Sequence, residues 1–345
     1  MMKKIIAILA VVLLLNACKK QETLAPSIDQ IYGPLTVTQP FSASTNTVNF
    51  TTGEKVFFNA KFKNDAVWII TITGATSTAV KTIRGVGNTI NVDNSSWNGS
   101  ADQVPSFQVE NVSVKLTFGH TSDVFSLAPI ALTGPFVQSS AKDVLVSNFV
   151  VNKRWYNSGP PCNCKYGYTG PNGWPSDYPN ISNTDNSYTK PDGNNYLIMS
   201  GTPWANIPGK PVSPYVNFLK IMADSSDFKY GKYFPLYADP EKVYFNIMIL
   251  GTNTPYSHLQ VNIIEEGRNG EDIIRIIDYR PNWTGWKLFS YRYSELAAGS
   301  AAMPNPQKVK GIQLLLLSDV PTLPGVDVKV GVDHIIFTHN APYQP

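Results

Sequence analysis

The sequence predicts an all-β protein built from two β-sandwich domains. Only 15% of its 345 residues are charged, whereas aromatic residues reach 12%. The 24 glycines and 26 prolines provide many turns, and Thr, Ser, Asn and Val fill much of the rest of the chain. After the first eighteen residues no amphipathic helix of useful length is apparent, and short apolar runs with a two-residue period recur instead. This composition is typical of a secreted all-β protein.

The first eighteen residues have the layout of a secretory signal. A short basic start is followed by the apolar run 5–15, which is too short to span a bilayer. The run ends in Leu15-Asn16-Ala17-Cys18, which resembles the cleavage site of bacterial lipoproteins. We therefore expect residues 1–17 to be removed, and the Cys18 thiol to be lipidated and anchored in a membrane leaflet. The alternative is an ordinary secreted protein in which Cys18 occurs by chance.

Residues 18–27 are expected to form a polar tether, because they carry no hydrophobic pattern. The chain has a formal net charge of +3, which falls to about +1 once the two lysines of the signal are removed. Apart from Lys19-Lys20 it contains no basic cluster. Nucleic acid is therefore not an expected partner, because its binding depends on neutralising many phosphates.

Residues 28–137 are predicted to form the first domain, an immunoglobulin-like β-sandwich. Strand-like runs recur there every eight to fifteen residues and are separated by turn-forming clusters such as Lys63-Asn64-Asp65. About a hundred residues of short strands at this spacing are typical of that fold. The expected strands are 55–62, 67–73, 88–92, 106–118 and 124–132.

Residues 138–345 are predicted to form the second domain, a jelly-roll β-sandwich. The strand-like runs become longer and more aliphatic after Gly134-Pro135, which marks the expected boundary. About nine such runs in two hundred residues are most simply accommodated by two facing sheets. The expected strands are 144–151, 196–200, 215–222, 243–250, 259–264, 273–279, 286–293, 309–317 and 326–338.

One segment of the second domain does not suit a core. Residues 155–193 contain one aliphatic side chain, seven aromatic ones and six prolines. Long loops of this kind are usually functional or disordered, and disordered segments are poor in aromatic residues. We therefore expect an ordered loop that displays its rings. A flat ring covers the apolar face of a sugar, while amides and hydroxyls satisfy its rim. Trp204 lies outside this loop, in the stretch 201–206 that directly follows a strand-like run, and it is the first choice for an exposed ring. The expected glycan-binding residues are Trp204, Trp174, Trp155, Tyr178 and Tyr166.

Two or three stacked rings would give micromolar to millimolar affinity, to which a repetitive polymer adds avidity. The alternative is that these rings only fasten the loop to the sheet beneath it.

Several short motifs of the second half occur in an order that is similar to a known family. They lie at residues 143–152, 192–197, 239–245, 284–289, 308–314 and 332–337. With a lipidated cysteine and an immunoglobulin-like module, they resemble the surface glycan-binding lipoproteins of Gram-negative polysaccharide-utilisation systems, whose jelly roll is galactose-binding-like. The resemblance implies a non-catalytic protein, held at the outer membrane by its lipid, that binds a polysaccharide or oligosaccharide. It also implies an outer-membrane glycan transporter complex as a partner.

The location on the outer membrane has two alternatives. The family's export tag after the lipidated cysteine is acidic, whereas Lys19-Lys20-Gln21-Glu22 contains a single acid. We expect the cell surface, and a periplasm-facing position remains open.

No organic cofactor is expected, and the resemblance implies one structural calcium ion between the first and last strands of the jelly roll. Asp143 and Asp333 are the acids in the matching strands. Cys162 and Cys164 are two positions apart, and they are expected either to form a local disulfide or to stay free.

Two other functions remain open. One is a protein-binding adhesin or a structural lipoprotein associated with a transporter. The other is a jelly-roll polysaccharide lyase, which would need a base beside a charge-stabilising cation; Tyr279, Arg280 and His258 are the residues that would supply them. No nucleophile or metalloprotease motif is present, and we expect no enzyme activity.

Overall fold

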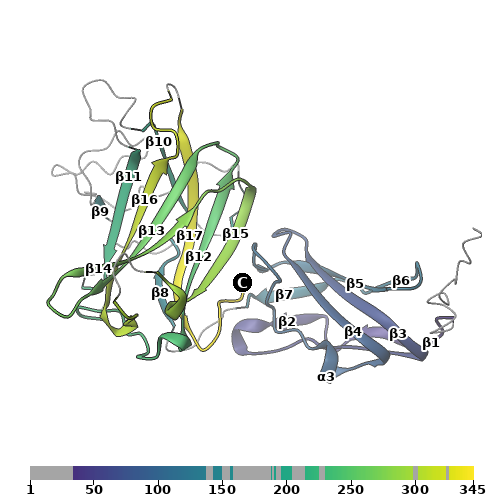
Figure 1. Cartoon of the computed structure of the whole chain (residues 1–345). Coiled ribbons are helices and arrows are strands. Elements are labelled where there is room, and N and C mark those ends of the chain that lie inside the picture. The colour runs from purple at the N-terminus through teal and green to yellow at the C-terminus, as the bar shows by residue number, and fades with distance from the viewer. Residues whose placement is uncertain are drawn as a thin grey trace, which may run out of the picture.

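Among the residues that the structure describes, the regular secondary structure is almost entirely β-strand, and the predicted all-β class is confirmed (Figure 1). The structure is a computed structural model. It describes residues 34–136, 143–149, 156–157, 188, 190–191, 196–203, 214–224, 230–297, 302–323 and 326–345. Within these ranges, no helix is long and apolar enough to cross a membrane.

The first part of the chain forms one continuous seven-stranded sheet. Its pairing order is β1-β3-β5-β7-β2, with β4 added to β3 and β6 added to β5. All pairs are antiparallel except β2 with β7, which is parallel. The immunoglobulin-like arrangement of these strands stays a prediction. Their bounds are β1 Val37–Ala43, β2 Thr47–Asn49, β3 Phe58–Gly74, β4 Val80–Ile90, β5 Asn111–Phe118, β6 Val124–Ser126 and β7 Ile130–Gly134.

Strand β3 is the central strand of this sheet, because it pairs with β1, β4 and β5. Its inward positions alternate with outward ones over almost its whole length, so that one face stays in the core. The start of β3 pairs with β1 and its end pairs with β5, while β4 follows it on the other side. Trp68 and Trp97 lie in the core, where they are at most 1% exposed. A short helix α3 (Val92–Ser95) caps the end of β4.

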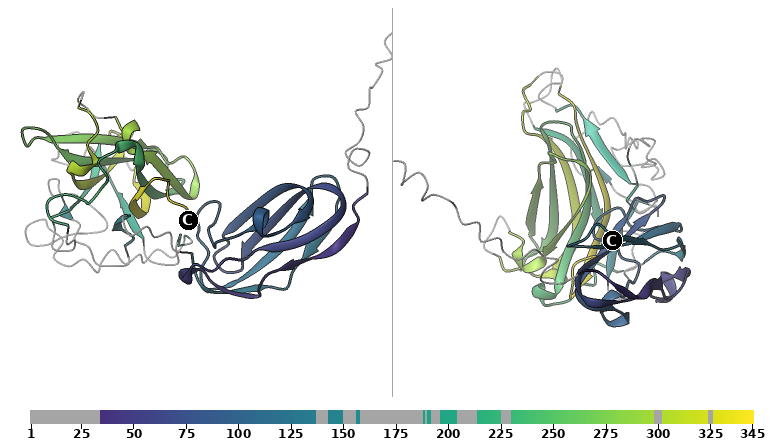
Figure 2. Two further views of the ribbon diagram at one scale, coloured as in Figure 1. Left: turned by 90° about the horizontal axis from the view of Figure 1, so that it is seen from below. Right: turned by 90° about the vertical axis from the view of Figure 1, so that its right-hand side faces the viewer.

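The second part of the chain forms two five-stranded sheets with a buried apolar cluster of their own. Figure 2 shows the two parts as separate bodies. The first sheet has the order β10-β17-β12-β15, with β8 added to β17, and the second has the order β14-β13-β16-β11-β9. The bounds are β8 Val144–Ser147, β9 Tyr156–Asn157, β10 Leu197–Gly201, β11 Tyr215–Met222, β12 Val243–Thr252, β13 Ser257–Glu266, β14 Asp272–Tyr279, β15 Thr284–Arg292, β16 Val309–Ser318 and β17 Val328–His339.

The core of the second part lies between its two sheets. Every second residue of β13 and β16 points into it, and aliphatic side chains such as Val261 and Leu314 are completely buried there. From the other sheet, Phe245 and Phe337 meet in the same core, with ring centroids 5.4 Å apart. Strand pairing and burial in the core both hold these strands. The residues on the outward side of each sheet are therefore held in fixed positions.

Strand β17 contains a bulge. Asn246 of β12 faces Ile336, but Met248 faces Asp333, so β17 has one residue more than its neighbour at this point. His334 lies in the bulge with a φ of 46°, and its ring packs at a tilt against Tyr343 with centroids 4.5 Å apart. The chain then turns back towards the first part, where the carbonyl of Pro345 accepts a hydrogen bond from the Ala101 amide at 2.7 Å.

Candidate functional site

The aromatic residues predicted to bind glycan lie outside the described residues, as does Cys18. Their roles therefore stay predictions. They are Trp155, Tyr166, Trp174, Tyr178 and Trp204.

Asp143 and Asp333 are described, and the structure does not bring them together. Asp143 accepts a hydrogen bond from the His339 amide at 3.0 Å, at the end of β17. Asp333 lies six positions earlier in β17, which corresponds to about 20 Å of strand. The pair does not fit a shared calcium ion, because antiparallel pairing puts the start of β8 beside the end of β17. Nor do the described residues contain a group of three or more His, Cys, Asp or Glu side chains placed to hold a metal.

A different set of candidates lies on the sheet β14-β13-β16-β11-β9. We call the side of this sheet that points away from the core the outer face. In β13, Leu259, Val261 and Ile263 are completely buried in the core. The strand period therefore turns the residues between them, Gln260 and Asn262, to the opposite side. Strands β14, β13, β16 and β11 lie side by side in Figure 1, so that their outward residues form one continuous surface.

The strand register arranges these outward residues in rows. One row crosses the sheet from Ile276 through Asn262 and Gln313 to Lys220. The next row, about 7 Å along the strands, runs from Asp278 through Gln260 and Leu315 to Phe218. Each row thus combines polar and apolar side chains.

Three amides from the two rows form a hydrogen-bonded chain that we call the amide row. The Gln260 amide nitrogen donates to the Asn262 carbonyl oxygen at 2.8 Å, and Asn262 donates to Gln313 at 3.0 Å. Asn262 is 7% exposed, whereas the two glutamines are only half-buried. A primary amide carries both donors and acceptors, so the outer members of this row match hydroxyl groups, which also do both.

Apolar surface flanks the amide row on both sides. Tyr215 is 37% exposed, and its ring lies 4.8 Å from that of the half-buried Phe218. On the other side Ile276 is 40% exposed. Exposed rings beside fixed amides are suited to a ligand that has apolar faces and hydroxyl edges.

Charged residues form a network at one end of the outer face. The His258 ring nitrogens lie 2.8 Å from Asp278 and 3.2 Å from Asp319. Arg280 donates to the other oxygen of Asp319 at 2.9 Å. Asp278 lies opposite Gln260, so this network borders the amide row.

The lyase residues are not assembled into one site. Tyr279 pairs with the inward-facing Leu259, is 4% exposed and packs on Phe289. Burial, with further contributions from Tyr291, raises the pKa of Tyr279 well above its usual value. His258 and Arg280 join the network on the outer face, so the phenol does not lie beside them. No proton transfer between these three groups is supported.

Sequence reasoning missed the amide row, although the sequence contained a signal for it. Gln260 and Asn262 interrupt an otherwise aliphatic strand at alternate positions, and Gln313 is a single amide in a run of leucines. Polar residues at alternate positions mark the outer side of a strand. Their meeting across two strands depends on the register, which the pattern does not reveal.

Comparisons with known proteins gave structural likenesses only. No protein-family model and no curated protein matches the chain. A family 11 carbohydrate-binding module from Clostridium thermocellum, solved with a β-1,3-1,4-mixed-linked tetrasaccharide, aligns with 59% of this chain and 100% of its own, at 12% identity and a TM-score of 0.33. SGBP-B from a xyloglucan utilisation locus of Bacteroides uniformis aligns with 87% of this chain and 73% of its own, at 11% identity and a TM-score of 0.35. Likenesses this distant say nothing further about the site.

Proposed function

We propose that this protein is a non-catalytic, polysaccharide-binding lipoprotein of the outer membrane, anchored through Cys18. The amide row on the outer face, with apolar side chains on both flanks, is the observation that carries the proposal. Amides at fixed positions exchange hydrogen bonds with sugar hydroxyls, and the flanking apolar groups cover sugar C–H faces. The support of two packed sheets holds these groups in place before ligand arrives, which lowers the entropic cost of binding.

The lipoprotein part of the proposal rests on the signal in residues 1–18. A tethered protein benefits from weak, repeated contacts, because a polymer presents many equivalent units. Its place is the cell surface, where polysaccharide is first met, in contact with a glycan transporter complex of the same membrane.

Replacing the two half-buried glutamines of the amide row is expected to weaken polysaccharide binding. Gln260→Ala and Gln313→Ala should each raise the apparent Kd, measured by retardation in affinity gels, about tenfold. Each substitution removes hydrogen bonds worth roughly 1–1.5 kcal/mol. The test uses soluble protein lacking residues 1–27 and the polysaccharide that a glycan array selects. Asn88→Ala, an exposed amide of β4, is the matched control. Unchanged retardation of both glutamine variants at full melting temperature would count against the outer face.

The tryptophans predicted from the sequence have their own test. Trp204→Ala and Trp174→Ala are expected to weaken retardation several-fold while the melting temperature is kept, since a stacked ring contributes on the order of 1 kcal/mol beyond its area. Loss of the fold instead would show that these rings belong to the core.

Two further measurements separate the alternative functions. Release of reducing sugar or unsaturated uronate from a polysaccharide panel would contradict the non-catalytic assignment. A pull-down that recovers a specific protein, with no glycan retained on the array, would favour the adhesin or the transporter-associated protein.

A further inference from the structure

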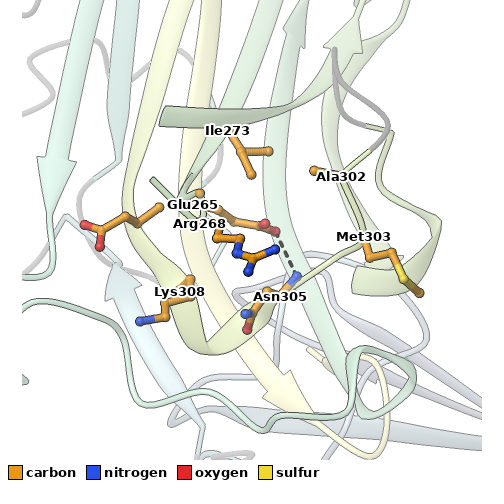
Figure 3. A pocket seen from close by; sticks show the side chains of 9 residues that line it. Glu265, Arg268, Ile273, Ala302, Met303, Asn305 and Lys308 are labelled. Carbon is orange, nitrogen blue, oxygen red and sulfur yellow. Dashed lines mark hydrogen bonds between the residues drawn. The ribbon is translucent and has the colours of Figure 1, made fainter. Parts of the chain in front are cut away.

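A separate pocket opens at one end of the second sheet. It has a volume of about 410 Å³ and lies between the turn that joins β13 to β14 and the segment that leads into β16. This volume suits a small ligand of one sugar ring. Figure 3 shows Arg268 at the centre of the pocket in this view, with Met303 on one side and Lys308 on the other. Glu266 at its edge is four positions from Asn262, or about 13 Å along β13, so the pocket is distinct from the amide row.

Both carboxylates that line the pocket are already neutralised. Glu265 is 1% exposed and forms an ion pair with Arg275, whose Nη2 donates to Oε2 at 3.1 Å, and it also accepts a hydrogen bond from the Tyr293 hydroxyl. Glu266 lies 2.5 Å from the Lys232 ammonium and accepts a hydrogen bond from Tyr233 at 2.8 Å. The hydrogen bond from Lys232, followed by that from Tyr233, lowers the pKa of Glu266, so that this carboxylate stays ionised and paired.

The two cations that line the pocket, Arg268 and Lys308, differ from the carboxylates because they have no ion-pair partner of opposite charge among the residues that the structure describes. The Lys308 ammonium instead lies 4.6 Å from the centre of the Tyr233 ring and 3.4 Å from its hydroxyl. The ring and hydroxyl fix the position of the ammonium without cancelling its charge. The pocket therefore presents two positive charges to a ligand.

Apart from Gly267 and Asn305, the rest of the lining is apolar. Ile273, Ala302 and Met303 form it, and Met303 is 86% exposed, which is unusual for so large an apolar side chain. A ligand that pairs with both cations and covers the apolar side chains carries one anionic group and one apolar face. An Arg guanidinium pairs a carboxylate in a bidentate way, and an exposed thioether adapts to an apolar face.

We propose that this pocket binds the carboxylate of an acidic sugar, a hexuronate, through Arg268 and Lys308, with the C–H face of the sugar against Met303. The proposal adds an acidic sugar unit to the polysaccharide ligand of the proposed function, and it rests on that function only in the choice of a sugar as ligand.

Titration calorimetry with D-glucuronate, D-glucose and acetate tests this assignment. The wild-type protein is expected to bind glucuronate in the millimolar range and at least tenfold more tightly than either glucose or acetate. Arg268→Gln and Lys308→Gln should each weaken glucuronate binding at least tenfold, at an unchanged melting temperature. Arg84→Gln, an exposed arginine of β4, is the matched control and should bind as the wild type does.

Three results would overturn the pocket assignment: no glucuronate binding, binding that survives Arg268→Gln, or acetate binding as tight as that of glucuronate. The last would indicate a site for small carboxylates without a sugar. Retention of neutral polysaccharide, measured on the same variants, keeps the two proposals apart. If the polysaccharide is retained while glucuronate fails to bind, only the pocket proposal fails. If glucuronate binds while no polysaccharide is retained, only the outer-face proposal fails.

Discussion

Replacing Arg275 by methionine is expected to reduce the free energy of unfolding by about 3–5 kcal/mol. The Glu265 and Arg275 side chains are 1% and 2% exposed and form an ion pair inside the second part of the protein. Arg275 also donates to the Leu296 carbonyl at 3.0 Å. Without the guanidinium, the Glu265 carboxylate has either to remain buried with fewer partners or to take up a proton. Both outcomes cost stability.

Unfolding by guanidinium chloride, measured for the variants of a double-mutant cycle, checks this expectation. The variant Glu265→Leu/Arg275→Met should be more stable than Arg275→Met alone, because apolar groups of similar volume often replace a buried ion pair without loss. Tyr293→Phe removes one donor to Glu265 and should cost only about 1–2 kcal/mol. If the double variant lost as much stability as Glu265→Leu and Arg275→Met lose together, the Glu265 and Arg275 side chains would act independently.

Acid is expected to destabilise the protein through His334. Burial lowers the pKa of His334 to about 4, whereas an unfolded chain has a histidine pKa of about 6.5. Both ring nitrogens are buried and form no hydrogen bond with a described residue. The folded state thus keeps the ring neutral while the unfolded state takes up a proton. The contribution is fully present above pH 6.5, and it is lost as the pH falls towards 4, by up to about 3 kcal/mol.

Urea unfolding between pH 7.5 and pH 4 measures this loss. His334→Asn removes the titrating ring, and asparagine tolerates the positive φ of the bulge. The stability of this variant should be lower at pH 7.5, because the ring contact with Tyr343 is lost, but it should change less with pH. His120→Asn in the first part is the matched histidine-to-asparagine control. A wild-type stability that stayed constant down to pH 4.5 would contradict the burial of a neutral ring.

The long aliphatic strands could be predicted almost residue by residue. The sequence indicated strands at 243–250 and 309–317, and the structure has β12 at Val243–Thr252 and β16 at Val309–Ser318. Continuous runs of buried apolar residues identify such strands locally. The strands of the first part were harder to predict. The cluster Lys63-Asn64-Asp65 suggested a turn, but it lies inside β3, where its polar side chains are directed mainly outwards.

Strand β4 illustrates the opposite error. Only residues 88–92 were expected to be extended there, whereas the strand covers Val80–Ile90. Its glycines and polar residues weaken the local signal. Pairing with ten residues of β3 holds the strand in place, and this partner is not visible in the sequence of β4 itself. Tertiary pairing therefore outweighed local preference.

The sequence alone determined that this chain folds into strands, that the apolar runs of its second half build a core, and that a signal with a lipidation cysteine is expected at its start. These properties follow from local composition and from a two-residue period. The tertiary structure decided which distant groups meet: Asn262 with Gln313, 51 positions apart, Arg275 with the Leu296 carbonyl, and Asp143 with His339 rather than with Asp333. Alternation fixes the side of a sheet to which a residue points, whereas strand order and register fix its neighbours, and these depend on the packing of the whole domain.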